Sequence, residues 1–538
     1  MAVPTVRTLR DLQSRFGSIT PQDLRDFLAS AVLQEQALAL GLLGPSGRSA
    51  TKVVTHPAAS ALRQAQADYV LGGPDINAAI AAAGAGKVEM TEGEFTLVSS
   101  ILDQGLDNIA LVGQGFASIL MAGDATNIKP FDFSGAATKT GWTFRDFKLD
   151  GNRANQTGPI DVTHGFHMKA INNSLFERLW ITGTYAESIR VEGGSGAKKN
   201  TIRAVIIDDG ADSGIYLTQA NCDENLIDGV WILGWLNDQG IRIRYGPNHN
   251  KVRNSVVIAL GTGESCITIE GSVSGSVTGN SVVGCTLDGG ETTPDSRVGA
   301  GVHVLSSTYA YETLIARNNI RRSRWGVLAA GGTGSIDHNT IKECDKGIRA
   351  TADRWSICDN PIDTIEGTGA DGMGIELNGI DRCIVKRNQI TNCVNEGIRL
   401  TDADKNIVKS NQITGNNRGI EESGTSDGNI IKDNMVDGNT TSSIRTVGAA
   451  TIVRDNPGYV TEAKGTGSIA NGATTAVITH GLGYTPVAAD IVVTLTENPT
   501  NTPGAIFVTT ITATQFTVNC ENDPGASGLD FSWAARKV

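Results

Sequence analysis

The sequence predicts an all-β protein, a right-handed parallel β-helix with a short helical N-terminus and a C-terminal β-sandwich. Three observations lead to this fold class. Asn and Gly-Ile recur through the middle of the chain at steps of about one solenoid coil, apolar and polar residues alternate there, and Val, Ile, Thr and Gly are abundant. Repeats of this length stack so that each coil lies over the one before it.

The repeats define two columns of residues. In the Asn column successive members are separated by 20, 21, 28, 23, 23 and 22 residues. That column contains Asn319, Asn339, Asn360, Asn388, Asn411, Asn434 and Asn456. The Gly-Ile column contains Gly214, Gly240, Gly301, Gly326, Gly347, Gly374, Gly397 and Gly419, with Cys266 and Ser443 in equivalent places. We expect each Asn to adopt a left-handed turn conformation and to hydrogen-bond the Asn of the next coil, which is a structural role.

The alternation within a coil has a period of two, as in Ile241-Arg242-Ile243-Arg244. One set of side chains therefore faces the interior and the other faces outwards. Leucine-rich repeats are disfavoured because the LxxLxL spacing is missing, and helical repeats because no period of 3.6 residues is present. Residues 107–459 have room for roughly 14 to 15 such coils.

The two ends of the chain differ from the repeats. Residues 1–45 contain a predicted helix, with Thr20 as N-cap and Pro21 at the first helical position. Residues 46–106 form the entry and cap of the β-helix. Residues 460–538 contain short Thr- and Val-rich strands separated by turn signals such as Asp523-Pro524-Gly525, which predicts a small β-sandwich.

Several segments resemble known families. Residues 75–115, with a short helix at 76–83 followed by Gly93 and Phe95, resemble the entry to pectate-lyase-like β-helices, although Thr91-Glu92 replace the usual Pro. Residues 141–155, GWTFRDFKLDGNRAN, resemble an early coil of the same superfamily. The segment ITPQDLRDFLASAV, residues 19–32, resembles an N-terminal motif of bacteriophage tail fibres and tailspikes. HGLGYTPVAADIVVTLT and the closing DFSWAARKV resemble C-terminal sandwich modules of phage tail proteins.

These resemblances imply a location and partners. The N-terminal segment would attach the protein to phage tail proteins of the virion, after synthesis in the host cytoplasm. The C-terminal module would form a homotrimer and cap the solenoid. The partner outside the virion would be a bacterial surface polysaccharide, either capsule or lipopolysaccharide.

Composition and motifs exclude other functions. The net charge of −12 and the pI near 5.2 disfavour nucleic acid as the main partner. No apolar run approaches ~18 residues, so no membrane span is predicted. The eight Cys contain no CxxC pair, which argues against a zinc site, and phosphate-binding and zincin motifs are missing. The seven His form no recognisable ligand set, so we expect no metal or cofactor, apart from Ca²⁺ if the protein is a lyase.

The candidate catalytic residues are three acids at equal steps. Asp212, Asp238 and Glu264 stand two residues before the Gly-Ile position and are 26 residues apart. Stacked carboxylates repel and raise one another's pKa, so folding does not favour this column and function is the better explanation. By contrast, the column Arg349, Glu376, Arg399, Glu421 and Arg445 alternates in sign, as a stabilising ladder does.

Residues suited to sugar binding surround the acids. The neighbouring outward column contains Tyr216, Arg242, Thr268 and His303, and the same coils contain Trp231, Trp235, Arg244 and Tyr245. Exposed aromatic faces stack on sugar rings, and Arg can pair with an acidic sugar. We take Tyr216, Arg242, Arg244, Trp235, Tyr245 and His303 as candidate substrate-binding residues, while core packing is an equally good explanation for Trp231.

Two reactions fit this arrangement. Carboxylates on adjacent coils, ~5 Å apart, suit a retaining glycosidase, and carboxylates two coils apart, ~9.6 Å, suit an inverting one. We expect Asp212 and Glu264 to be the inverting pair, with Asp238 assisting. The alternatives are a lyase that uses Ca²⁺ with Arg242 or Arg244, and a non-catalytic fibre or decoration adhesin of the same fold.

Overall fold

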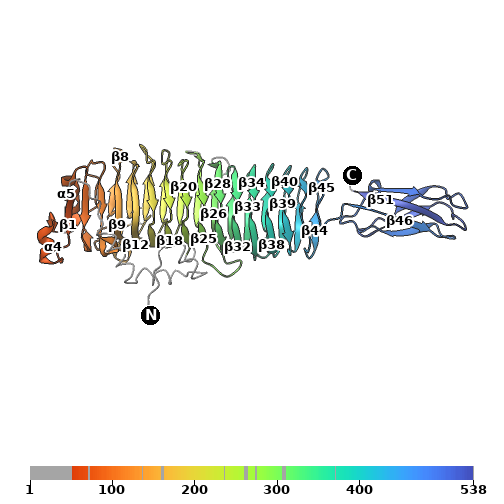
Figure 1. Cartoon of the computed structure of the whole chain (residues 1–538), viewed down its shortest axis with the longest axis horizontal. Coiled ribbons are helices and arrows are strands. Elements are labelled where there is room, and N and C mark those ends of the chain that lie inside the picture. Colours follow the sequence, from red (N-terminus) through yellow and green to blue (C-terminus); the bar gives the residue numbers. More distant parts are fainter. Residues whose placement is uncertain are drawn as a thin grey trace. The chain divides into compact units, whose positions relative to one another are not determined.

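The computed structural model describes residues 51–70, 73–135, 137–158, 163–235, 237–259, 265–272, 275–305, 310–369 and 371–536. The chain is 48% strand and 5% helix and forms a parallel β-solenoid of about 14 turns (Figure 1), which confirms the predicted fold class. It divides into two units, Met1–Asp345 and Lys346–Val538. The predicted helix within residues 1–45 lies outside the described residues.

The coils of the first unit form three parallel faces, and the third face begins only with β7. Face 1 contains β1 (Thr51–Thr55), β3 (Lys87–Met90), β5 (Ala110–Val112), the first halves of β9 (Thr143–Asp150) and β12 (Leu175–Thr182), β14 (Thr201–Arg203), β17 (Leu226–Asp228), β20 (Lys251–Arg253), β24 (Ser281–Val283), β28 (Thr313–Ala316) and β31 (Gly334–Asp337). Face 2 contains β4 (Gly93–Leu97), β6 (Ser118–Ala122), the second halves of β9 and β12, β15 (Ile206–Gly210), β18 (Trp231–Trp235), β21 (Val256–Ile258), β25 (Thr286–Asp288), β29 (Asn319–Arg321) and β32 (Thr340–Cys344). Face 3 contains β7 (Phe131–Phe133), β10 (Phe166–Lys169), β13 (Ile189–Glu192), β16 (Ile215–Thr218), β19 (Ile241–Arg244), β22 (Ile267–Glu270), β26 (Ala300–Leu305) and β30 (Trp325–Ala329).

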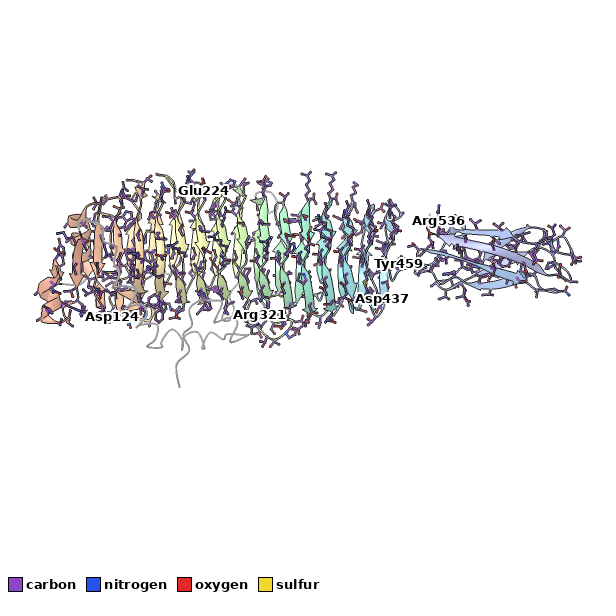
Figure 2. The ribbon with its side chains drawn as sticks, viewed as in Figure 1. Asp124, Glu224, Arg321, Asp437, Tyr459 and Arg536 are labelled. Carbon is purple, nitrogen blue, oxygen red and sulfur yellow. The ribbon has the colours of Figure 1, made fainter. Side chains whose placement is uncertain are left out.

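Short elements complete the first unit. Turn residues such as Asp124, after β6, and Glu224, before β17, carry their side chains at the margins of the coils (Figure 2). The remaining elements are β2 (Tyr69–Val70), β8 (Lys139–Thr140), β11 (Ile171–Asn172), β23 (Val277–Thr278), β27 (Ala310–Tyr311), α4 (Ala61–Gln66), and the 3₁₀ turns η1 (Gly115–Ala117) and η2 (Arg153–Asn155). The predicted entry helix is α5 (Gly73–Ala83), which packs on β1 and buries Ile76 and Ile80.

The second unit repeats the same three-strand coil. Its strands are β33 (Lys346–Ala350), β34 (Trp355–Cys358), β35 (Pro361–Ile365), β36 (Ile375–Asn378), β37 (Ile384–Lys386), β38 (Gln389–Cys393), β39 (Glu396–Thr401), β40 (Ile407–Lys409), β41 (Gln412–Thr414), β42 (Arg418–Ser423), β43 (Ile430–Lys432), β44 (Ser442–Arg445) and β45 (Ile452–Arg454).

A β-sandwich follows these coils in the sequence. One antiparallel sheet has the order β46 (Glu462–Ile469), β51 (Leu529–Arg536), β48 (Ile491–Leu495), and the other has the order β47 (Thr475–Thr479), β50 (Gln515–Cys520), β49 (Ile506–Thr509). The 3₁₀ turn η4 (Ala488–Asp490) precedes β48. Both sheets contribute to one apolar core around Phe516, Phe531 and Trp533, so the predicted sandwich is present.

Alternation places the core inside the coils. In β19, Ile241 and Ile243 are fully buried, whereas Arg242 and Arg244 alternate with them and remain partly exposed. Glycine precedes many of these strands because the coils approach closely there. A Cβ atom on Gly240 would lie 2.7 Å from the carbonyl oxygen of Cys266 in the next coil, so the glycine column serves packing.

The Asn columns form ladders of buried side-chain amides. Asn411 Nδ2 donates to Asn434 Oδ1 over 2.9 Å and to the Val385 carbonyl over 3.0 Å. Asn225 likewise donates to Asn250 over 3.0 Å, so the predicted bonds between coils are confirmed.

Two details of the Asn prediction are wrong. The left-handed conformation falls on the residue before each Asn, for example Ser410 with a φ of 55°, which leaves the amide free to point inwards. The ladder residue in the coil of β29 is Asn318, which donates to Asn339 over 2.9 Å, whereas Asn319 is exposed.

Among the described residues, no helix has the length and apolar character needed to cross a membrane.

Candidate functional site

The outward side chains of face 3 form two columns in the first unit, which we call together the polar strip. The strand register places Arg190 beside Tyr216, Tyr216 beside Arg242, and Arg242 beside Thr268. This first column comprises Asp132, His167, Arg190, Tyr216, Arg242, Thr268 and His303. The second column, two residues further along each strand, comprises Lys169, Glu192, Thr218, Arg244 and Glu270.

Asp212 and Asp238 lie at the edge of the strip where its strands begin, in the turns that precede β16 and β19. One residue, Ser213, connects them. Its backbone N–H donates to Asp212 Oδ1 over 2.9 Å, and its hydroxyl donates to Asp238 Oδ2 over 2.9 Å. The structure therefore brings together two of the three predicted catalytic acids on neighbouring coils.

The environments of the two carboxylates differ. Burial, together with the negative charges of Glu187 and Asp238, raises the pKa of Asp212 to about 6, although the Ser213 N–H and Arg242 act in the opposite direction. Asp238 instead forms an ion pair with Arg242, and both of its hydrogen bonds involve Oδ2. Near pH 6 and below, Asp212 holds a proton, while Asp238 has Arg242 as a cationic partner. Two carboxyl groups in such different environments can act as an acid and a base.

Glu187 lies one coil before Asp212 and was missed by the sequence analysis. It is buried, its Oε2 lies 2.5 Å from His164 Nδ1, and its Oε1 lies 3.4 Å from Arg190 Nη1. Although burial alone would raise the pKa of Glu187, His164 and Arg190 hold it below the usual range. Glu187 is therefore a charged group close to Asp212.

His167 occupies the next coil towards the N-terminus. Its Nδ1 lies 3.1 Å from Asp132 Oδ1 and its Nε2 lies 3.3 Å from Glu192 Oε2. Burial opposes the charged ring, but these two carboxylates raise the pKa of His167 above its usual value. His167 also lowers the pKa of Glu192 to about 2. Extending the Gly-Ile register back to Gly165-Phe166 would have placed His167 in the column.

The other predicted substrate-binding residues are placed as follows. Tyr216 is 7% exposed and lies between the guanidinium groups of Arg190 and Arg242, 5.4 and 5.3 Å from its ring centroid. Arg244 stacks over Tyr245 at 4.0 Å. His303 lies further along the first column, where burial lowers its pKa to about 4.

Trp235 is 1% exposed, so the prediction that it offers an exposed ring to a sugar is wrong. Its ring packs against the turn before β19. A Cβ atom on Gly240, in that turn, would lie 3.2 Å from Trp235 Cη2. Glu264 lies outside the described residues. Trp231 belongs to a buried apolar cluster with Leu233, in keeping with the core-packing explanation.

The ionisable side chains of the polar strip lie in pairs, such as His167 with Asp132. Among the described residues of the strip, no three carboxylate, imidazole or thiolate ligand atoms converge within 4.8 Å. The strip instead offers a proton donor, an anionic partner and several hydrogen-bonding groups on a rigid sheet, as acid–base chemistry requires.

The alternating column of the second unit is a charge ladder. Arg349 Nε lies 3.3 Å from Glu376 Oε2, and Arg445 Nη1 lies 2.7 Å from Glu421 Oε1. Arg399 lies between Glu376 and Glu421 in the register, and it pairs with the carboxylate of Glu396, at 3.9 Å. The predicted structural role fits these ion pairs.

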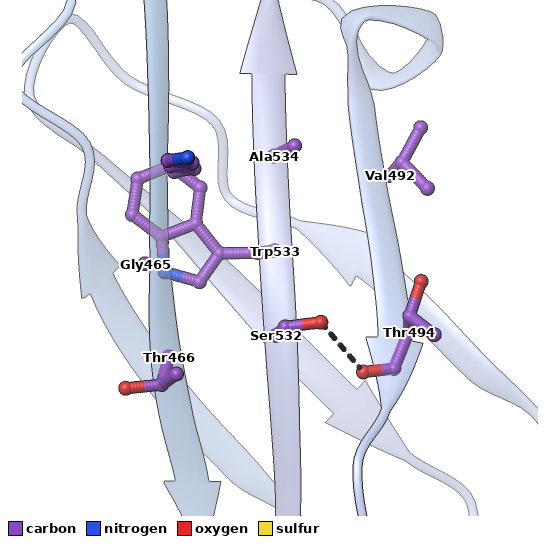
Figure 3. A pocket seen from close by; sticks show the side chains of 8 residues that line it. Gly465, Thr466, Val492, Thr494, Ser532, Trp533 and Ala534 are labelled. Carbon is purple, nitrogen blue, oxygen red and sulfur yellow. Dashed lines mark hydrogen bonds between the residues drawn. The ribbon is translucent and has the colours of Figure 1, made fainter.

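A groove of about 490 Å³ lies on the sandwich (Figure 3). It is lined by Lys464, Gly465, Thr466, Val492, Thr494, Ser532, Trp533 and Ala534. The hydroxyl of Ser532 donates to the carbonyl of Thr494 across its floor over 3.4 Å. The lining contains no carboxylate, so this groove cannot supply the acid pair that the polar strip supplies.

Comparisons with known proteins find one family model and several similar solved structures. The model of a family described as periplasmic copper-binding protein (NosD) matches residues 284–457, less than half of the chain. No curated protein matches the chain. One similar solved structure is the family 28 exopolygalacturonase of Yersinia enterocolitica, with 10% identity and a TM-score of 0.41; the match covers 72% of this chain and 79% of that one. A second is the GH87 α-1,3-glucanase of Streptomyces thermodiastaticus, with 14% identity, a TM-score of 0.38 and coverage of 77% and 70%. A third is the Dettilon tailspike protein, with 12% identity, a TM-score of 0.36 and coverage of 89% and 93%.

Proposed function

We propose that the protein is a glycoside hydrolase that depolymerises a bacterial surface polysaccharide on the polar strip. The observation that carries this proposal is the pair of carboxylates joined through Ser213, one of which is protonated near pH 6 while the other is paired with Arg242. Glycoside hydrolysis uses one carboxyl group that donates a proton and a second carboxyl group close to it.

Asp212 is the proton donor in this mechanism. Its Oδ1 accepts the Ser213 N–H, which leaves Oδ2 to hold the proton that passes to the glycosidic oxygen as the C–O bond breaks. Asp238 faces the sugar through Oδ1, since Oδ2 is held by Ser213 and Arg242. Asp238 Oδ1 bonds to the anomeric carbon, and a water molecule that loses its proton to Asp212 then releases the sugar.

The spacing of the pair favours retention of anomeric configuration. Neighbouring coils are ~4.8 Å apart, close to the ~5 Å separation of retaining enzymes, whereas inverting enzymes keep their acids ~6.5–9.5 Å apart. Nuclear magnetic resonance of the first product formed will distinguish the two. Retention supports Asp212 with Asp238, and inversion supports the originally predicted pair of Asp212 with Glu264.

The biological setting that we propose is that of a bacteriophage tailspike. In this setting the N-terminal segment attaches a homotrimer to the virion, and the solenoid binds host capsule or lipopolysaccharide. The segment resemblances in residues 19–32 and in the C-terminal sandwich support this setting.

The test uses purified bacterial surface polysaccharides. We expect new reducing ends with at least one of them, and turnover reduced by about 10²-fold or more in Asp212→Asn. Asp228→Asn is a matched control, because Asp228 lies on face 1 of the coil that also contains Asp238 and pairs there with Arg253. Binding without cleavage would support the adhesin instead, and unsaturated uronates would support a lyase.

A further inference from the structure

The arginines of the polar strip are all engaged by carboxylates of the protein itself. Arg190 approaches Glu187 and Glu192, at 3.4 and 3.5 Å. Arg242 pairs with Asp238 and lies 3.4 Å from Glu270 Oε2. A guanidinium that is already paired offers little to an anionic ligand, because the ligand would have to displace the carboxylate.

One carboxylate oxygen of Glu270 forms ion pairs with two arginines. Its Oε2 lies 2.8 Å from Arg244 Nε as well as 3.4 Å from Arg242 Nη2, and the register places Glu270 directly beside Arg244. Arg244 has no other carboxylate partner among the described residues. Neutralisation of Arg244 therefore depends on Glu270, whereas Arg242 also has Asp238 as a partner.

Beyond Arg242, the first column of the strip offers uncharged contacts. It continues with Thr268 and His303. Arg244 covers the ring of Tyr245. Lys169 has no ion pair among the described residues, but it lies three coils away from Arg244 in the second column.

We infer that the polar strip selects an uncharged glycan and that Glu270 is the residue that determines this specificity. The inference rests on the proposed function for the identity of the site, and it deepens that function by naming the substrate class. Glu270 occupies the two guanidinium groups that would otherwise hold the carboxylate of a uronic acid. Removing its charge frees Arg244 completely and Arg242 in part.

The first experiment measures binding and does not depend on turnover. Full-length Glu270→Gln, titrated with oligogalacturonate by calorimetry at low salt, should bind about tenfold more tightly than the parent, since one charge-assisted pair contributes about that factor. Glu177→Gln is a matched control. Glu177 also pairs with two arginines, Arg178 and Arg203, but it lies on face 1.

Equal binding by the parent and by Glu270→Gln would overturn the inference, as would an equal gain in Glu177→Gln. Loss of the gain in Glu270→Gln/Arg244→Ala would locate the new affinity at Arg244 and support the inference.

The second experiment uses the polysaccharide cleaved in the activity screen. If that polymer is neutral, oxidation of its primary hydroxyls to carboxylates should lower cleavage by the parent at least tenfold, and Glu270→Gln should recover part of the loss. If the polymer carries uronates and chemical reduction of its carboxyl groups abolishes cleavage, the inference is wrong while the proposed function stands. If no polymer is cleaved, the proposed function fails, and the binding experiment still decides the role of Glu270.

Discussion

At the scale of single residues, the site depends on the burial and the neighbouring charges that raise the pKa of Asp212. Asp212 acts as an acid only while it is protonated, and its pKa is raised to about 6. We therefore expect kcat/KM to fall as the pH rises through about 6, which is the alkaline limb of the profile. A profile that rises through this range would contradict the assignment of Asp212 as proton donor.

The same raised pKa has a consequence for stability. Because the folded-state pKa lies above the unfolded value, the contribution of Asp212 to stability is fully present below the unfolded pKa near 4 and is lost as the pH rises through about 6.

Glu187 provides a second test at this scale. Its negative charge is one of the causes that keep Asp212 protonated, so Glu187→Gln should move the alkaline limb to lower pH. The pH profile of kcat/KM measures the shift, and circular dichroism confirms that the fold is kept. Glu177→Gln, a buried acid of face 1, should leave the limb where it is. A reduced rate with an unchanged limb would show that Glu187 acts only in packing.

Part of the candidate site could be predicted from the sequence. Equal steps of 26 residues were enough to stack Asp212 and Asp238, because a solenoid turns chain spacing into contact. His164 and Glu187 were not predicted as neighbours of the acids, because they stand one position away from the acid column in the sequence. The burial of Trp235 could not be predicted either, since its position in β18 does not reveal which turn its ring packs behind.

At the scale of elements, the Asn ladders hold each coil to the next. Asn411 is buried, donates to Val385 and Asn434, and accepts from Asn388. Asn411→Ala should lower the free energy of unfolding by about 2–4 kcal/mol, because buried donors and acceptors lose their partners. Urea denaturation checks the value. Gln412→Ala, at the exposed neighbouring position, should change stability by less than about 0.5 kcal/mol.

The coil register was the most predictable feature of the fold, for a physical reason. Period-two alternation and a close-packed glycine fix which face each residue occupies, so a slip of one residue would place isoleucines outside. The turns are less constrained. This explains why the sequence-based prediction placed the left-handed conformation on the Asn itself and assigned Asn319, not Asn318, to the ladder.

At the scale of the whole molecule, the proposed trimer has a physical basis in the sandwich. The outer face of the sheet β47-β50-β49 presents no charged side chain among the described residues. Val477 and Phe507 on that face are 62% and 49% exposed. The net charge of −12 opposes self-association elsewhere on the chain. An uncharged face of this kind is where copies can meet without electrostatic cost.

We therefore expect light scattering to give about three times the chain mass of 56.4 kDa. Val477→Lys places charges on the face that would meet its copies, and it should convert the assembly to monomers without unfolding the sandwich, since position 477 is exposed. Val98→Lys is the matched control, because Val98 is 60% exposed but lies just after β4 in the solenoid. A parent protein of monomer mass would remove the trimer from the proposal and leave the polar strip unaffected, because every contact described there lies within one chain.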